Sequence, residues 1–116
     1  MNMAETKDKV IIFGSEMVGQ GDEILGFQIM MTLLESLAKR DDGPKAVIFW
    51  NTAVKLLTEG SPAVPRLKAL EEKGVQLLAG RFCLTDLCIA DTVAVGKAAS
   101  MDEILDLILH SDVINL

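Results

Sequence analysis

Two residues of this sequence are capable of nucleophilic chemistry at neutral pH, the cysteines Cys83 and Cys88. A cysteine reacts as its thiolate, which is stabilised at the start of a helix or beside a cation. Cys83 directly precedes a predicted helix start at Thr85 or Asp86, and Arg81 precedes it closely. The carboxylate of Asp86 acts in the opposite sense. We therefore interpret Cys83 as the candidate catalytic thiol, with simple burial as a small apolar residue as the alternative.

The other candidate chemical groups have weaker support. Cys88 lies between Leu87 and Ile89 in an apolar segment, so we expect it to be a core residue. The two cysteines and the single histidine, His110, do not supply the four ligands of a structural zinc site. His110 lies near the end of the last predicted helix, where a cation interacts favourably with the helix dipole. We expect neither a metal nor a cofactor.

A second candidate site is the glycine-rich loop 14–22, which joins a predicted strand to a helix N-terminus. Backbone N–H groups at such a position can hold an anion. The loop matches neither a Walker nor a Rossmann pattern, and Glu16 and Asp22 would repel a phosphate. We favour the interpretation in which the glycines shape the turn and Asp22 caps the helix; binding of a small ligand or nucleotide is the alternative. The candidate binding residues are Gly14, Ser15, Gly19, Gly21, Asp22, Asn51 and Arg81.

The elements that must position these residues alternate along the chain. Apolar runs predict strands, and capping residues and periodic apolar positions predict helices between them. Alternation with short links indicates a mainly parallel five-stranded sheet covered by helices on both faces, an α/β fold. Asn51 then follows the second strand, at the edge of the sheet where open α/β folds bind ligands. The predicted strands are 9–13, 45–50, 75–79, 92–95 and 112–116; the main predicted helices are 22–39, the segment after Pro62 as far as Lys73, and the segment after Ser100, which opens with a capping box.

Length and charge limit the possible classes of protein. The 116 residues, 50% of them hydrophobic, suit one domain, which we place at 9–116 after a flexible N-terminal segment 1–8. A net charge of -6 argues against a nucleic-acid partner. No apolar run approaches the about 20 residues that cross a bilayer, so we expect no membrane association. The polar N-terminal segment does not resemble a signal peptide, and we expect a cytoplasmic protein.

Helix 22–39 is apolar over more than half of its circumference. A helix of a monomer needs one apolar stripe only, and a broad exposed apolar surface usually marks an interaction site. We therefore expect this helix to pack on the sheet with one side and on another subunit with the other. The alternative is that a neighbouring helix of the same chain covers it.

Several segments of the sequence together resemble the DsrE/DsrF-like family, and most closely the C-terminal domain of YedF-type proteins. They extend from residue 10 to the C-terminus. The resemblance implies a flavodoxin-like three-layer α/β/α domain, assembly into trimers or hexamers, and transfer of sulfur as a cysteine persulfide. The segments are Met17-Val-Gly-Gln-Gly-Asp-Glu-Ile-Leu-Gly26, Phe49-Trp-Asn-Thr-Ala-Val-Lys-Leu56, Glu59-Gly-Ser61, Leu70-Glu-Glu-Lys-Gly-Val75, and Val95-Gly96 followed by Met101.

The turn after the third strand departs from the family pattern. Members of the family often have Cys-Gly-Thr-Cys-Leu there, whereas this sequence has Gly80-Arg-Phe-Cys-Leu84, so only the second cysteine is present. YedF-type proteins also carry a TusA-like domain that this sequence lacks, which implies that a separate TusA-like protein would donate the sulfur. The leading hypothesis is a sulfurtransferase-like persulfide carrier acting through Cys83. The alternatives are a non-catalytic oligomeric binding module and a small-ligand binder that uses the loop 14–22.

Overall fold

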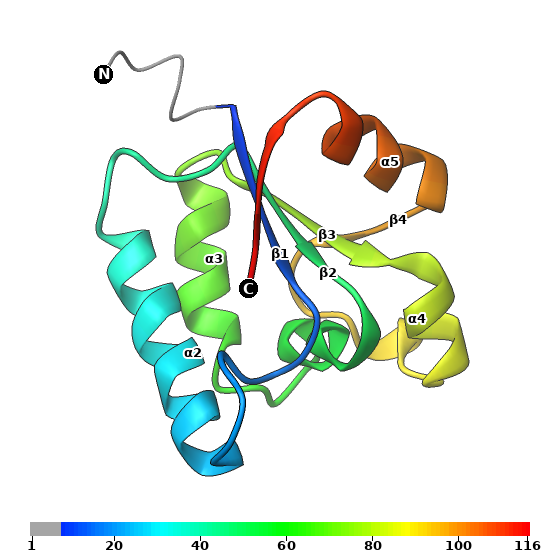
Figure 1. The fold of residues 1–116 in the computed structure, drawn as a ribbon. Coiled ribbons are helices and arrows are strands. Elements are labelled where there is room, and N and C mark those ends of the chain that lie inside the picture. The colour runs from blue at the N-terminus through cyan, green and yellow to red at the C-terminus, as the bar shows by residue number, and fades with distance from the viewer. Residues whose placement is uncertain (1–7) are drawn as a thin grey trace.

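The five strands form one entirely parallel sheet in the computed structural model, which describes residues 8–116. The strand order is β4-β3-β2-β1-β5, so β1 lies between β2 and β5 (Figure 1). The expectation of a flexible segment 1–8 falls outside the described residues except for Asp8, a turn residue directly before β1. The strands are β1 (Lys9–Phe13), β2 (Ala46–Phe49), β3 (Gln76–Gly80), β4 (Lys97–Ala99) and β5 (Asp112–Asn115).

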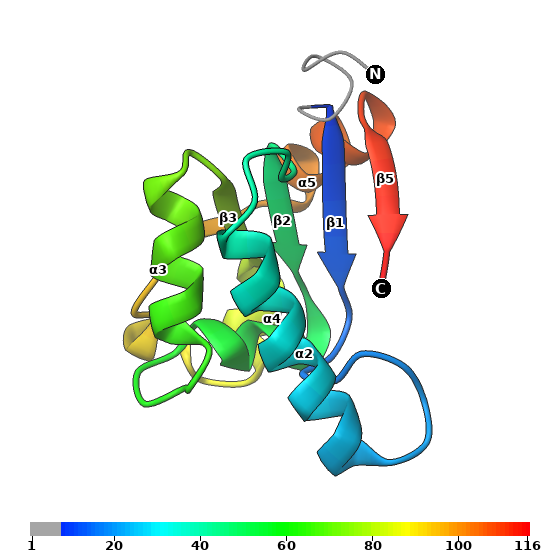
Figure 2. The same ribbon diagram turned by 90° about the vertical axis from the view of Figure 1, so that its left-hand side faces the viewer.

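Helices cover both faces of the sheet, as predicted. The connections from β1 to β4 step along the sheet in one direction, and a right-handed crossover then puts their helices on one face. The connection from β4 to β5 steps back, so the same handedness puts α5 on the opposite face, as Figure 2 shows. The flavodoxin-like three-layer α/β/α architecture is thereby confirmed. The helices are α2 (Glu23–Ala38), η1 (Asn51–Leu57), α3 (Val64–Glu72), α4 (Arg81–Asp86), η2 (Ala90–Thr92) and α5 (Met101–Leu109).

Successive strand residues contribute to two cores, one on each face, because side chains alternate along a strand. Phe13 and Phe49 lie side by side on β1 and β2 and pack against α2 and α3, with their ring centroids 5.7 Å apart. On the other face, Ile12 and Ile48 pack under Ile104 of α5. Within residues 8–116, no helix combines the length and the apolar character needed to span a membrane.

Local signals at the helix ends are mostly confirmed. The carboxylate of Asp22 accepts an N–H from Leu25 at 2.9 Å and caps α2. Ser100 and Glu103 form the predicted capping box of α5. Gly74, with φ 89°, ends the α3 segment in the left-handed conformation that a glycine C-terminal cap needs.

Two predicted elements are wrong. Residues 92–95 are not a strand: Val93 forms only an isolated antiparallel bridge with Thr58, and pairing with β3 begins after Gly96 reverses the chain with φ 78°. The apolar side chain of Val95 suggested a strand, but Val95 lies in a loop and its side chain is buried in the core. The second error is the predicted helix start at Thr85 or Asp86. Helix α4 begins at Arg81 and ends at Asp86.

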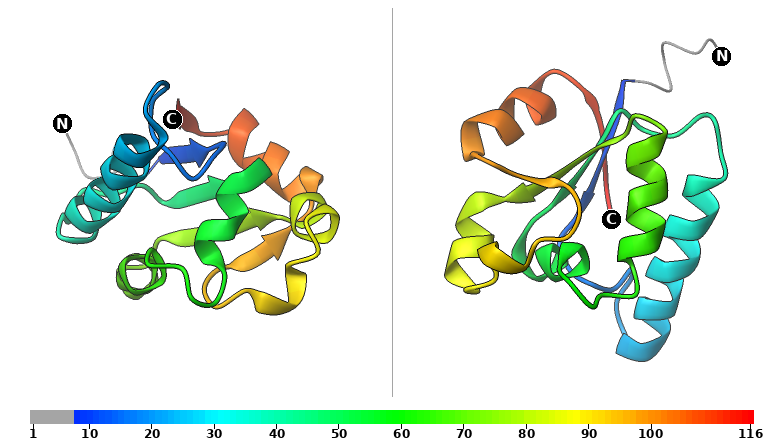
Figure 3. Two further views of the ribbon diagram at one scale, coloured as in Figure 1. Left: turned by 90° about the horizontal axis from the view of Figure 1, so that it is seen from below. Right: turned by 180° about the vertical axis from the view of Figure 1, so that it is seen from behind.

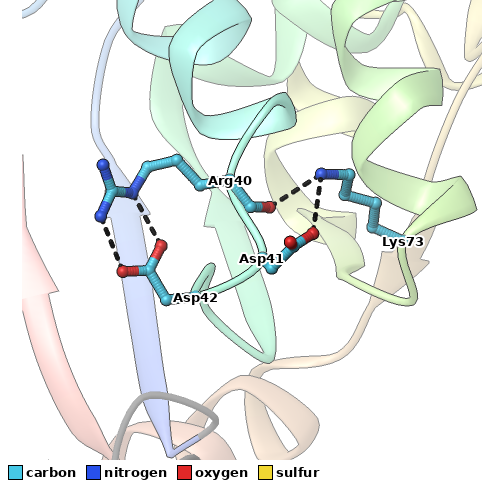
Figure 4. Close-up of polar contacts among 4 residues, drawn as sticks. All are labelled: Arg40, Asp41, Asp42 and Lys73. Atoms are coloured by element: carbon cyan, nitrogen blue, oxygen red, sulfur yellow. Dashed lines mark hydrogen bonds and ion pairs between the residues drawn. The ribbon is translucent and has the colours of Figure 1, made fainter.

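The loop between α2 and β2 is tied to the end of α3 at the amino edge of the sheet (Figure 4). The ammonium of Lys73 donates to the main-chain oxygen of Arg40 at 2.9 Å and lies 3.5 Å from Asp41. Arg40 donates two hydrogen bonds of 2.7 Å to Asp42, and this guanidinium lowers the pKa of the Asp42 carboxyl. The charged groups of Arg40, Asp41, Asp42 and Lys73 therefore pair with one another or with the main chain, which indicates a structural role.

Candidate functional site

A pocket of about 440 Å³ lies where β1, β2 and β3 end. Residues that follow neighbouring parallel strands meet at this carboxyl edge, which is where open α/β sheets bind ligands. The structure here brings together three of the predicted site residues, Gly14, Asn51 and Cys83. The full lining is Gly14, Trp50, Asn51, Phe82, Cys83, Asp86 and Leu87.

The thiol of Cys83 faces a main-chain donor in this pocket. Cys83 lies in the first turn of α4 because the helix begins directly after Gly80, and its side chain is half-buried. The main-chain N–H of Asn51 donates to the Cys83 Sγ at 3.1 Å. Asn51 has φ 53°, a left-handed conformation that asparagine tolerates better than most residues. An N–H held in this way stabilises negative charge on the sulfur.

Gly80 supplies space beside this sulfur. A Cβ atom at position 80 would lie 3.3 Å from the Cys83 Sγ and 3.6 Å from the Cβ of Trp50. The backbone of Gly80 has φ -57°, which any residue adopts, so the glycine is not required by its conformation. Its effect is to leave one side of the thiol free of a neighbouring side chain.

The remaining walls are apolar and carry one carboxylate. Phe82 is 79% exposed and Leu87 is half-buried. Asp86 is the charged residue of the lining, and among residues 8–116 its carboxylate has no ion-pair or hydrogen-bond partner. Arg81 does not neutralise it, because the Arg81 guanidinium lies 3.9 Å from Glu103 of α5. The pocket therefore has a negative electrostatic character.

The loop 14–22 forms a separate, smaller hollow of about 270 Å³, lined by Ser15, Gly19, Gly21 and Asp22 among others. The Ser15 hydroxyl accepts the Met17 N–H and donates to the Met17 oxygen, so it closes its own turn. Gly19 and Gly21 have φ values of 84° and 123°, which only glycine adopts readily. The turn-shaping interpretation is thus confirmed, whereas ligand binding by these residues and by Arg81 stays a prediction.

The prediction that Cys88 belongs to the core is wrong. Helix α4 ends before it, and Cys88 occupies the left-handed position beyond the helix with φ 59° and an exposed side chain. Ile89 takes the place against the core instead. His110 ends α5, as predicted, and its Nδ1 lies 2.8 Å from the Asp106 oxygen. Across residues 8–116, no cluster of His, Cys, Asp and Glu could hold a metal ion.

Sequence reasoning did not assign Trp50, Phe82 and Asp86 to the pocket. A signal for Trp50 was present, since the single tryptophan follows β2 directly at the ligand-binding edge. Phe82 and Asp86 were missed because the helix was predicted to begin at Thr85 or Asp86, after its true start at Arg81. In a helix that includes both residues, Cys83 and Asp86 are three positions apart and share a face.

Fold and site together define a three-layer α/β domain with a thiol in a pocket at the carboxyl edge of its sheet. No family model matches the chain, and no curated protein sequence does. Three solved structures share the fold, each with a TM-score of 0.65. They are YchN from E. coli (13% identity, 94% of this chain and 99% of that one), BT1422 from Bacteroides thetaiotaomicron (15%, 94% and 95%) and MTH1491 from Methanobacterium thermoautotrophicum (15%, 93% and 98%), the last two described as being of unknown function.

Proposed function

We propose that the protein is a DsrE-like sulfur carrier that holds a sulfane sulfur on Cys83. The observation that carries this proposal is the placement of the Cys83 Sγ in a pocket, with the Asn51 N–H donated to it at 3.1 Å. The sequence resemblance to the DsrE/DsrF-like family and the fold shared with YchN support it. We place its action in the cytoplasm, because a carrier thiol needs a compartment that keeps cysteines reduced.

The transfer is a thiol exchange that needs no oxidant. The Cys83 thiolate attacks the outer sulfur of a donor persulfide, the donor S–S bond breaks, and the donor leaves as a thiolate. Cys83 then carries the sulfur as a persulfide and passes it to an acceptor thiolate by the same reaction. The free side of the thiol next to Gly80 offers room for the second sulfur atom. A separate TusA-like protein is the proposed donor.

The test is persulfide loading measured by mass spectrometry of the intact protein. After incubation with a sulfane-sulfur donor, we expect a mass gain of one sulfur atom on Cys83. Cys83→Ser should abolish this gain, and Cys88→Ser should retain it. Loading that survives Cys83→Ser and disappears in Cys88→Ser contradicts the assignment.

The alternative, an oligomeric binding module without thiol chemistry, is favoured by the surface of α2. Helix α3 covers one side of α2, but Ile24, Leu25 and Ile29 remain 75%, 54% and 40% exposed. Leu25, Ile29 and Leu33 also border a shallow groove of about 420 Å³. This surface fits the proposed trimer or hexamer assembled through helix 22–39.

Light scattering tests the assembly. The native chain should have a mass of several subunits, and Ile29→Glu should lower it because a charge would be buried in the interface. Leu109→Glu, on the exposed side of α5, is the matched control and should leave the mass unchanged. A native chain that is monomeric at high concentration rules the assembly out.

A further inference from the structure

The pocket beside Cys83 carries a negative charge. Its lining contains one charged residue, Asp86, which has no ion-pair partner among residues 8–116. The nearest cation in the sequence, Arg81, interacts instead with Glu103. The whole chain adds a net charge of -6. An anionic ligand would therefore approach Cys83 against the local field.

The apolar walls favour the same kind of ligand. Two aromatic residues, Trp50 and Phe82, belong to the lining, and Phe82 is 79% exposed. Aromatic faces attract ammonium and guanidinium groups that come within about 6 Å of the ring centre. The pocket, at about 440 Å³, is open to solvent on the scale of a peptide side chain or a small thiol compound.

We infer that Cys83 accepts sulfur from persulfides, and passes it to thiols, that carry a positive charge near the sulfur, such as a cysteine flanked by a basic residue on a partner protein. This inference rests on the proposed function and names its substrate class. Acidic low-molecular-weight thiols are disfavoured substrates. The selectivity arises from the Asp86 carboxylate, which lies one helical turn from Cys83 on α4.

The size of the effect follows from the geometry. Side chains three positions apart in a helix are about 6 Å apart, so a charged reagent at the Cys83 sulfur lies about that far from the Asp86 carboxylate. At this distance in water, the Coulomb energy between the two unit charges changes a rate about threefold. A cationic reagent should therefore react about threefold faster than a neutral one. An anionic reagent should react about threefold slower, and added salt should reduce both differences.

Three symmetrical disulfides measure this selectivity: cystamine as the cation, bis(2-hydroxyethyl) disulfide as the neutral reagent and 3,3′-dithiodipropionate as the anion. The Cys83 thiolate attacks one sulfur, the reagent S–S bond breaks, and half of the reagent leaves as a thiolate. Rates are measured in the full chain carrying Cys88→Ser and are divided by those of an uncharged model thiol. We expect the order cation, neutral, anion, with about a tenfold ratio between the extremes.

Two variants locate the source of the selectivity. Asp86→Asn should remove most of the tenfold ratio, whereas Glu72→Gln, at the far end of α3, removes the same charge from the protein and should preserve the ratio. Circular dichroism checks that both variants fold. Reaction at rates that show no charge order, or an order that survives Asp86→Asn, overturns this inference alone. Failure of Cys83 to react with any of the three reagents overturns the proposed function as well.

Discussion

A cysteine introduced at position 80 should form a disulfide with Cys83. In a disulfide, the Cβ of one cysteine lies about 3 Å from the sulfur of the other, given an S–S bond of about 2.05 Å. A Cβ at position 80 would lie 3.3 Å from the Cys83 Sγ, so a shift of a few tenths of an ångström brings the two residues to bonding geometry. The backbone φ of -57° at Gly80 accepts a side chain.

The stability gain of this disulfide can be estimated from its loop. The bond closes a loop of about four residues, for which the chain-entropy model gives about 2 kcal/mol. For a domain of this size, that difference corresponds to a Tm about 8 °C higher in the oxidised Gly80→Cys protein than in its reduced form.

Thiol titration and thermal unfolding before and after oxidation measure the effect in a Cys88→Ser background. The control is Gly43→Cys, because a Cβ at Gly43 would meet nothing within 4 Å and its loop lies at the opposite edge of the sheet. After oxidation, the Gly80→Cys protein should lose both titratable thiols, and the Gly43→Cys protein should keep both, without disulfide links between chains. Retention of both thiols in oxidised Gly80→Cys would refute the placement of the Cys83 sulfur beside Gly80.

Four further substitutions test the local geometry by urea unfolding. Cys88→Gly should stabilise the protein by about 1 kcal/mol, since glycine adopts the φ of 59° found there without strain; no gain would argue against the left-handed conformation. Gly96→Ala should cost more than Gly60→Ala, because both have positive φ but only a Cβ at Gly96 meets a main-chain oxygen at 2.9 Å; equal costs would contradict that contact. Ser100→Ala should cost about 1 kcal/mol through loss of the helix cap. The pKa of the Glu103 carboxyl is lowered from 4.5, chiefly by the hydrogen bond from the Ser100 main-chain N–H. The stability that this carboxylate adds to the fold is therefore present above pH 4.5 and is lost as the pH falls through the lowered pKa. Glu103→Gln should make the free energy of unfolding less dependent on pH in this range.

The fold was predictable because its signals are local and strong. The predicted strand 9–13 matches β1 residue for residue, and the capping box of Ser100 and Glu103 correctly predicts the start of α5. The fourth strand was not predictable from its composition, because the residues of Lys97–Ala99 have no preference for strands. The segment forms a strand because it pairs with β3. Tertiary pairing here overrides local propensity.

The candidate site was predictable in part. Cys83 and Asn51 could be placed at one edge of the sheet because both follow predicted strands. The contact between the Asn51 N–H and the Cys83 sulfur depends on a left-handed residue and on an early start of α4. Neither feature has a sequence signal as strong as a glycine or a capping box, and the carboxylate of Asp86 was therefore assigned to the wrong end of the helix.

The position of β1 in the sheet affects how the chain is made. Of the five strands of the sheet, β1 is synthesised first and its partner on one side, β5, last, about a hundred residues later. Lys9 and Asp112 join these two strands by an ion pair of 2.7 Å. Until α5 and β5 emerge, one edge of β1 presents unpaired N–H and C=O groups, and the face of the sheet that α5 covers in the complete domain is open (Figure 3). An incomplete chain on the ribosome therefore exposes an apolar sheet with an open edge, the kind of intermediate that chaperones bind.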